Sequence, residues 1–388
     1  MKRVTMLALI LSVLLACGGE PTPTGEELVA TQVAVEKAAA ATLTAEAPTE
    51  PPLPTGTAVP TGSPTPTEPP PPTDTPLPPT RTPSPLGMSR SNPAPGSEVF
   101  SAPNLDIQVL EVKRGKAAWN AVKKANRFNT APPKGMEYVS VKLHVTSTHT
   151  DDESHFIGPG DFKITGDSSV LYSSASIVDP KPALDAELYS GGQATGWATF
   201  AVRKGEENLI LIVDELWNWD EDRIRFIAVD EGAAFGLPPE LEDIEATDLG
   251  MERGAPAPLG EMVTSEDWEV QILEVKRGKA AWKATKKANP LNDPPEKGMV
   301  YLAARVRARY VGTADEPSDV GSAAFQTTGS ENIVYEAPPV VDPAPALDCS
   351  LYPGGVCEGW VVLQAAKGET GLMAVFQPLW DLSGDDVR

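Results

Sequence analysis

Leu110-Glu111-Val112-Lys113-Arg114-Gly115-Lys116-Ala117-Ala118-Trp119 occurs a second time in this chain of 388 residues, as Leu273-Glu274-Val275-Lys276-Arg277-Gly278-Lys279-Ala280-Ala281-Trp282. The second stretch lies 163 positions after the first. The same offset holds without a gap from Pro93 and Pro256 to Arg225 and Arg388. A constant offset of this length indicates two copies of one folded unit. A feature that the fold requires should therefore occur in both copies.

Each copy has the residue pattern of short β-strands. Apolar residues alternate with polar ones along 139–145 and along 302–310, which predicts half-buried strands with an apolar inner face. Several such stretches, separated by glycine and proline turns, are typical of an antiparallel sandwich. A single helix is predicted over 115–126, with Ala118, Trp119 and Val122 on one face. The further predicted strands are 107–112, 170–178, 194–202, 209–213 and 224–229.

Short motifs around these strands recur in both copies. They are Arg114-Gly115, Asn126, Asn129, Lys134-Gly135-Met136, Leu188-Tyr189, Gly191-Gly192 and Gly196-Trp197, repeated as Arg277-Gly278, Asn289, Asn292, Lys297-Gly298-Met299, Leu351-Tyr352, Gly354-Gly355 and Gly359-Trp360. With these motifs each copy resembles the telokin-like, immunoglobulin-like domain of unknown function found in bacterial surface lipoproteins. The resemblance implies a mainly β fold with two tandem Ig-like antiparallel β-sandwiches, each with a short helical insertion. It also implies an extracytoplasmic setting, and it implies no activity.

The two copies differ at their ends. Copy one continues past Arg225 into Phe226-Ile227-Ala228-Val229, which has the composition of a closing strand. Arg388, the equivalent of Arg225, is the last residue of copy two. We expect copy two to lack this strand, so that its sheet edge is open or is filled by another segment.

The N-terminus has the pattern of a bacterial lipoprotein signal. Lys2 and Arg3 precede an apolar run over 4–15, which is too short to span a bilayer. The run ends in Leu14-Leu15-Ala16-Cys17-Gly18, which is similar to a lipobox. We predict a signal peptide over 1–16 and lipidation of Cys17; an ordinary secretory signal with a chance cysteine is the alternative. No later segment approaches 18 apolar residues, so the predicted attachment is a lipid rather than a span.

The segment between Cys17 and the first copy has two parts. Thr24-Gly25-Glu26-Glu27 has the pattern of a capping box, so a short helix is predicted within 17–47. Residues 48–92 form a Pro/Thr-rich stalk that is expected to be disordered, because proline fixes φ and lacks an amide hydrogen. The predicted remainder is Ig-like domain 1 at 93–230, an acidic linker at 231–255 and Ig-like domain 2 at 256–388.

Cysteine use predicts one disulfide. Cys349 and Cys357 are the two cysteines outside the lipobox, and an even pair in an exported chain indicates a bridge. Copy one has Ala186 and Ala194 at the matching positions. The predicted bridge therefore stabilises one copy and is not required by the fold. The two cysteines have no histidines nearby in sequence, so they make a poor metal site.

The charge of the chain limits its partners. Its formal net charge is −22, which disfavours binding to nucleic acid and to anionic lipid. A basic segment nonetheless recurs in both copies. It is the candidate site for an anionic ligand, with a solvated basic face or docking of the acidic linker as alternatives. Its residues are Lys113, Arg114, Lys116, Lys123 and Lys124, repeated as Lys276, Arg277, Lys279, Lys286 and Lys287.

The remaining chemistry-bearing residues point to no catalytic site. His144, His149 and His155 are absent from copy two, and a solvated loop is expected, with a weak metal site as the alternative. Asp179 recurs as Asp342, and Asp185 as Asp348, but Val178-Asp179-Pro180 has the composition of a turn. Triad, Walker and zinc-protease motifs are missing from the sequence. The tryptophans are expected in the core rather than on a sugar platform: Trp119, Trp197 and Trp217, repeated as Trp282, Trp360 and Trp380.

These observations favour a lipid-anchored, non-enzymatic binding or adhesion protein on the extracytoplasmic face of the bacterial membrane. Two small domains on a long stalk give reach and two-point contact. The expected partners are the membrane, through Cys17, and an envelope glycan, an anionic polymer or a surface protein; no cofactor is expected. A structural envelope spacer or assembly subunit is the second hypothesis, and a hydrolase of envelope glycans is a remote third.

Overall fold

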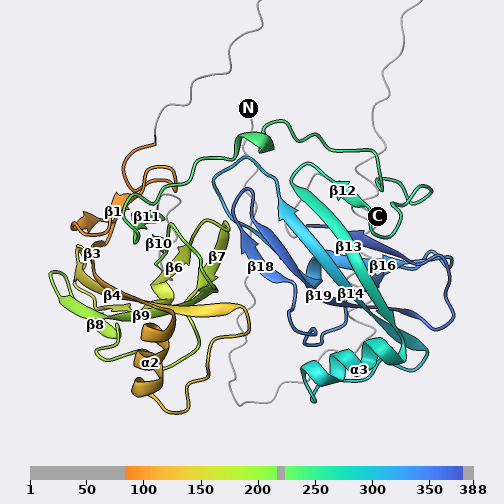
Figure 1. The fold of residues 1–388 in the computed structure, drawn as a ribbon, viewed down its shortest axis with the longest axis horizontal. Coiled ribbons are helices and arrows are strands. Elements are labelled where there is room, and N and C mark those ends of the chain that lie inside the picture. The colour runs from red at the N-terminus through yellow and green to blue at the C-terminus, as the bar shows by residue number, and fades with distance from the viewer. Residues whose placement is uncertain (1–83, 216–222, 379–388) are drawn as a thin grey trace, which may run out of the picture. The chain divides into compact units, whose positions relative to one another are not determined.

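A computed structural model describes residues 84–215 and 223–378 (Figure 1). All of them belong to one compact unit that begins at Pro79. The predicted signal peptide, Cys17, the N-terminal helix and nearly all of the stalk lie outside the described residues. Trp217 and Trp380 do so as well.

Domain 1 contains two antiparallel sheets that face each other. One sheet has the order β2-β3-β4-β9. The other begins β1-β11-β10-β6-β7 and continues into two strands of the second copy; its one parallel pair is β1 with β11. Strands β5 and β8 form a separate pair. The strands are β1 (Ala94–Pro95), β2 (Phe100–Ser101), β3 (Leu105–Arg114), β4 (Met136–Ser147), β5 (His155–Ile157), β6 (Phe162–Thr165), β7 (Val170–Ser173), β8 (Ala186–Leu188), β9 (Gln193–Arg203), β10 (Ile210–Val213) and β11 (Arg225–Ala228). Helix α2 (Gly115–Ala125) joins β3 to β4, and a 3₁₀ turn spans Pro159–Asp161.

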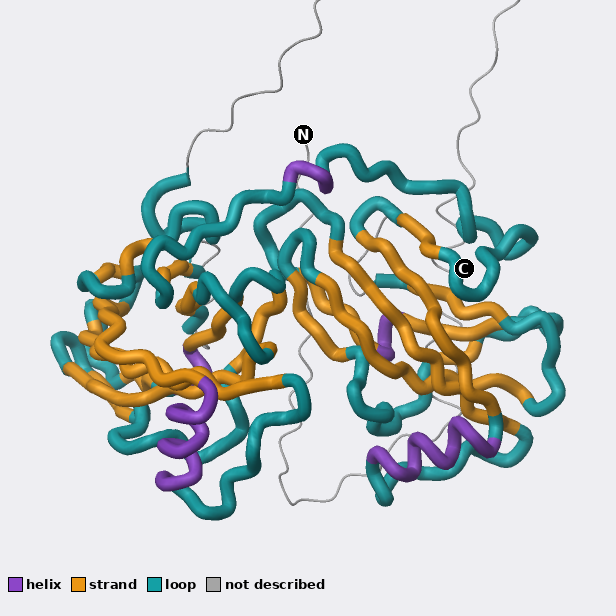
Figure 2. The backbone as a smooth tube through the Cα atoms, in the orientation of Figure 1, coloured by secondary structure: helices purple, strands orange, loops and turns teal. Residues whose placement is uncertain are grey.

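Domain 2 has a similar arrangement, but its second sheet has no equivalent of β1 or β11 among the described residues. One sheet has the order β12-β13-β14-β19, and β17-β16-β20 form the other. The strands are β12 (Met262–Thr264), β13 (Trp268–Arg277), β14 (Met299–Tyr310), β15 (Ser318–Gly321), β16 (Phe325–Thr328), β17 (Tyr335–Glu336), β18 (Asp348–Leu351), β19 (Val356–Ala366) and β20 (Met373–Phe376). Helix α3 (Lys279–Ala288) matches α2, and 3₁₀ turns span Ser322–Ala324 here and Pro239–Leu241 in the linker. Strand therefore predominates over helix in both copies, as predicted (Figure 2).

The alternation along β4 explains how the sandwich closes. Val141, Leu143 and Val145 are fully buried in the core between the two sheets of domain 1. At the start of the strand the opposite face is buried as well, because Tyr138 packs against Ala118 of α2. The helix thus covers the outer face of the sheet at one end, and the rest of that face is only partly buried.

Some predicted strand limits differ from the structure. Residues 174–178 are not a strand; Ser174 forms only an isolated bridge with Phe200. Strands β5, β6 and β8 were not predicted. Each of them has three or four residues, which is too short for an alternating pattern to be distinguished from a turn-rich loop.

The two copies share hydrogen-bonded structure. Strand β7 pairs with β18 of the other copy, with Leu171 opposite Ser350 and Val170 opposite Leu351. Residues 84–92, assigned to the stalk by sequence, are part of this folded unit: Phe226 donates its amide hydrogen to the carbonyl of Gly87. The acidic linker is also packed, and Leu241 within it is buried. The connections between the copies are therefore structured where they are described.

Candidate functional site

The basic residues nearest the repeated tryptophans are held by contacts within each copy. Lys113 Nζ lies 3.7 Å from the ring centroid of Trp197 and 3.0 Å from Glu111 Oε1. In copy two the matching lysine, Lys276, lies 3.6 Å from the ring centroid of Trp360. Its Nζ is also 3.4 Å from Glu274 Oε1. These two lysines cover buried indole rings, which is a structural role.

The two repeated arginines differ in their surroundings. Arg114 Nη1 lies 3.4 Å from Asp230 Oδ2, and Arg114 Nη2 lies 3.9 Å from Glu137 Oε1. Arg277, at the matching position, is exposed and makes no ion pair with any described residue. Val300 stands where copy one has Glu137. Sequence identity between the copies therefore conceals a difference in electrostatic environment.

The remaining six basic residues are exposed on the helices. None of them lies within ion-pair distance of a carboxylate in the part of the chain that is described. Two pairs stand in the last helical turns, where cations are favourable to the helix dipole. The six are Lys116, Lys123 and Lys124 on α2 and Lys279, Lys286 and Lys287 on α3.

An asparagine-built loop follows each helix. Asn129 Nδ2 donates to the carbonyl oxygens of Val122 and Val178, at 2.8 Å each, and Asn129 Oδ1 accepts from the Val178 amide at 2.9 Å. Asn126 Oδ1 accepts from the amide of Phe128 at 3.0 Å. Asn289 and Asn292 make the same set of bonds in copy two. The motif asparagines therefore fix the loop to both the helix end and the turn at Val178.

The loop and the turn bonded to it display apolar side chains to solvent. Phe128 is 76% exposed, and the matching Leu291 is 87% exposed. Val178 and Val341 are 45% and 51% exposed. Sequence analysis missed these four residues; the signal was available, since each is an apolar residue at a turn position in both copies. We call Lys123, Lys124, Phe128 and Val178, with Lys286, Lys287, Leu291 and Val341, the helix–loop surface.

Two histidines and an aspartate come together where the loop after β4 leads into β5. One ligand atom of each of His149, Asp151 and His155 lies within 4.8 Å of the others. The two imidazole rings are stacked with centroids 3.5 Å apart, and His155 Nε2 is 2.8 Å from Asp151 Oδ1. Burial, followed by the charge of His155, lowers the pKa of His149, which favours the neutral ring that a metal requires. His144 lies elsewhere and bonds Thr195.

Zinc is expected to bind this group, because imidazole and carboxylate are its usual ligands. Titration of Zn²⁺ into the protein should give one site per chain, since Gly312, Ala314 and Ser318 stand at the matching positions of copy two. His155→Ala should abolish the calorimetric signal, and His144→Ala should leave it unchanged. Equal zinc affinity in the two variants would contradict the assignment.

Asp179 and Asp342 are a repeated pair of buried carboxyl groups. Burial raises the pKa of each to about 6, partly offset by hydrogen bonds from the matching positions Thr199 and Val362. Asp342 Oδ1 accepts from the Val362 amide at 2.6 Å. Neither lines the apolar cavity that Pro256–Glu261 and Phe376 border in domain 2. Their repeated bonds to β9 and β19 indicate a structural position at the turn.

Asp179→Asn should stabilise the protein at neutral pH. Because the folded-state pKa is raised, the native state binds more protons than the unfolded state between about pH 4 and pH 6, so stability falls as pH rises through that window. The variant should gain about 1–2 kcal/mol in free energy of unfolding at pH 7.5, and the gain should vanish near pH 4. Urea titrations at both pH values test this. Asp185→Asn, at an exposed carboxyl, is the control.

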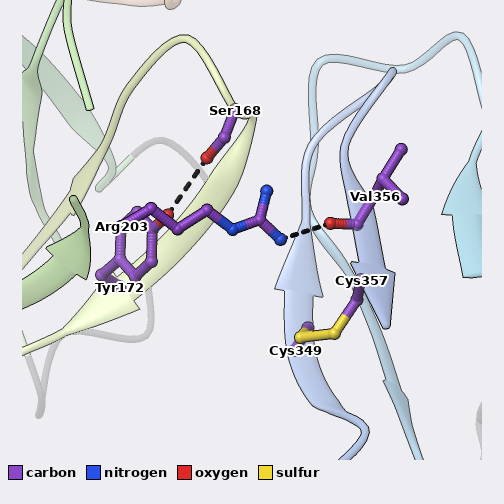
Figure 3. Close-up of a disulfide and its surroundings, with 6 residues drawn as sticks. All are labelled: Ser168, Tyr172, Arg203, Cys349, Val356 and Cys357. Atoms are coloured by element: carbon purple, nitrogen blue, oxygen red, sulfur yellow. Dashed lines mark hydrogen bonds between the residues drawn. A yellow bond between two sulfur atoms is a disulfide. The ribbon is translucent and has the colours of Figure 1, made fainter. Parts of the chain in front are cut away.

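A disulfide joins Cys349 of β18 to Cys357 of β19, with their Cα atoms 6.4 Å apart (Figure 3). The Arg203 guanidinium of copy one donates to the carbonyl of Val356, beside this bridge. The bridge is therefore present in copy two only, next to a contact between the copies.

No helix in the described part of the chain is long and apolar enough to cross a membrane.

Comparison with known proteins gives structural likenesses alone. No family model and no curated protein matches the chain. The yjhA protein of Bacillus subtilis is 14% identical and covers 35% of this chain and 99% of its own, with a TM-score of 0.26. The candidate lipoprotein ycdA of Bacillus subtilis subsp. subtilis str. 168 is 12% identical, and the match covers 34% of this chain and 38% of that protein, with a TM-score of 0.27. An uncharacterised β-sandwich protein of Clostridium difficile 630 is 10% identical, and the match covers 40% of this chain and 100% of that protein, with a TM-score of 0.25.

Proposed function

We propose that this is a lipid-anchored cell-surface protein whose two sandwiches bind an anionic envelope glycan or polymer through the helix–loop surface. The observation that supports this most is the recurrence of that surface. Exposed lysines stand at matching positions in the last turn of α2 and of α3. An exposed apolar side chain follows on a loop that the same asparagine bonds hold in both copies. Because the fold buries neither the lysines nor the apolar side chains, both remain accessible to a ligand.

The chemistry of the surface matches a polyanion with apolar parts. Lysine ammonium groups attract carboxylate or phosphate groups, and Phe128 and Leu291 can pack on the carbon face of a sugar. Each exposed charge contributes little by itself in salt. Two copies on one chain raise the apparent affinity without a strong single site.

A structural spacer is the second function, and the paired basic residues support it. Lys113, Lys276 and Arg114 are held by ion pairs within the chain. If the exposed lysines serve only solubility, the protein binds no polymer and acts through its length.

Binding to a polyuronate such as alginate, with neutral dextran as the control, separates the two functions. The test variant carries Lys123→Glu, Lys124→Glu, Lys286→Glu and Lys287→Glu. The matched control carries the same change in charge at the exposed residues Lys134, Lys204, Lys297 and Lys367. We expect the test variant to lose at least about tenfold in affinity, the control to change little, and binding to weaken with salt. Equal loss in both variants, or no binding by the native protein, would favour the spacer.

A further inference from the structure

Domain 2 has an open apolar cavity where domain 1 has a strand. The cavity has a volume of about 210 Å³. One wall is the segment Pro256–Glu261, the other wall is Leu372–Ala374 with Phe376 of β20, and the floor is core residues such as Leu302 and Leu363. It therefore opens from the sheet edge directly into the hydrophobic core.

Domain 1 shows what occupies the same place. There, β11 lies between β1 and β10, with Ile227 opposite Ala94 on one side and opposite Leu211 on the other. Ile227 is fully buried. The matching residues of domain 2 are Ala257 and Ala374, and both line the cavity. The cavity is thus the position that an aliphatic side chain of a β-strand fills in the other copy.

Strand β20 lies at the edge of its sheet in the described part of the chain. Among the described residues, β20 has β16 as its single partner, whereas the matching strand β10 pairs with both β6 and β11. The peptide groups on the free side of β20 can therefore form a ladder with an added strand, which is the mode of β-augmentation.

Charge defines a second requirement for the occupant. In domain 1, Asp230 lies three residues after Ile227; its carboxylate accepts from the Leu209 amide at 2.9 Å and lies 3.4 Å from Arg114. In domain 2, Arg277 lines the cavity and has no carboxylate partner among the described residues. A strand with a carboxylate three residues after its inserted aliphatic residue would supply that partner.

We propose that domain 2 binds an extended peptide segment of a partner protein between Pro256–Glu261 and β20. The segment runs antiparallel to β20, inserts an aliphatic side chain between Ala257 and Ala374, and places a carboxylate on Arg277. The cavity and the strand edge provide affinity, and Arg277 fixes the register. This site is separate from the helix–loop surface and does not depend on the function proposed for it.

The test uses a labelled peptide with the sequence of residues 223–232, which holds the native pattern of β11. Fluorescence anisotropy with the full chain should show saturable one-to-one binding, roughly micromolar in Kd. The peptide variant Ile227→Asp should bind at least about tenfold more weakly, because it places a charge in an apolar cavity. No saturable binding of the native peptide would overturn the proposal.

A charge exchange locates the site in domain 2. The peptide variant Asp230→Lys should bind native protein about tenfold more weakly, and the exposed protein substitution Arg277→Glu should restore its binding. The protein substitution Arg114→Glu should not restore binding, because Arg114 already forms an ion pair with Asp230 of the same chain. Failure of the exchange would overturn the assignment of Arg277. Analytical ultracentrifugation identifies any other occupant of the site. If the protein is a dimer and does not bind the peptide, the occupant is a second copy of the chain. If it is a monomer and does not bind the peptide, the occupant is a segment of the same chain.

Discussion

Arg90→Ala is expected to lower the free energy of unfolding by about 3 kcal/mol, because this side chain is buried between the two copies. Arg90 is 1% exposed; its Nε donates to Asp315 Oδ1 at 2.7 Å, and its Nη1 donates to Ser169 Oγ at 3.4 Å. Its guanidinium also lies 3.9 Å from the ring centroid of Tyr352. Truncation removes a charge-assisted bond, a cation–π contact and buried volume together.

Urea unfolding followed by tryptophan fluorescence measures the loss. We expect a lower midpoint and, since the contact joins the copies, two transitions in place of one. Arg305→Ala is the control, because Arg305 and Glu358 form an ion pair with side chains that are 45% and 38% exposed. That variant should lose less than about 1 kcal/mol. Equal effects of the two substitutions would show that the Arg90 contact contributes little.

Trp268→Ala is expected to cost about 4 kcal/mol, which is in the range for removing a large aromatic side chain from a core. Trp268 is 1% exposed, with its ring centroid 5.1 Å from that of Tyr310 and 6.0 Å from that of Phe376. These three rings pack together in the core of domain 2, beside the cavity whose lining includes Phe376. The alanine side chain would leave a void that the surrounding strands cannot close.

Copy one provides the matched control for this substitution. Leu105 stands at the position of Trp268 and is 3% exposed, so Trp268→Leu introduces a side chain that this fold already accepts. Thermal unfolding by calorimetry should show a loss of roughly 1–2 kcal/mol for leucine and the larger loss for alanine. If the leucine variant were as unstable as the alanine variant, the aromatic contacts rather than the filled volume would account for the stability.

The comparison of the two copies separates binding features from structural ones. The asparagine-built loops, the exposed lysines and the apolar tips recur, although nothing in either core requires an exposed phenylalanine or leucine. Within the described residues, the closing strand and the ion pair of Arg114 occur in copy one and have no equivalent in copy two. A repeated exposed surface is consistent with two-point contact to a repetitive ligand. The open edge of β20 in domain 2 is consistent with binding of one partner strand.

The sequence by itself determined the duplication, the mainly β fold and the helix after the first long strand. The alternation along 139–145 and the 163-residue offset are local or self-comparing signals, so they need no tertiary information. The buried face of α2 followed as well: Ala118 and Val122 are fully buried, as their spacing predicts.

Only the tertiary structure decided which of the repeated basic residues are free. Lys113 and Lys116 are three residues apart in one motif, yet the first is held over Trp197 and the second faces solvent. That difference depends on β9, which is distant in sequence and adjacent in the sheet. The burial of Arg90 and the open edge of β20 depend in the same way on which strands lie side by side. Burial and charge pairing are properties of contacts across the chain, and a local pattern specifies the strand without specifying its neighbour.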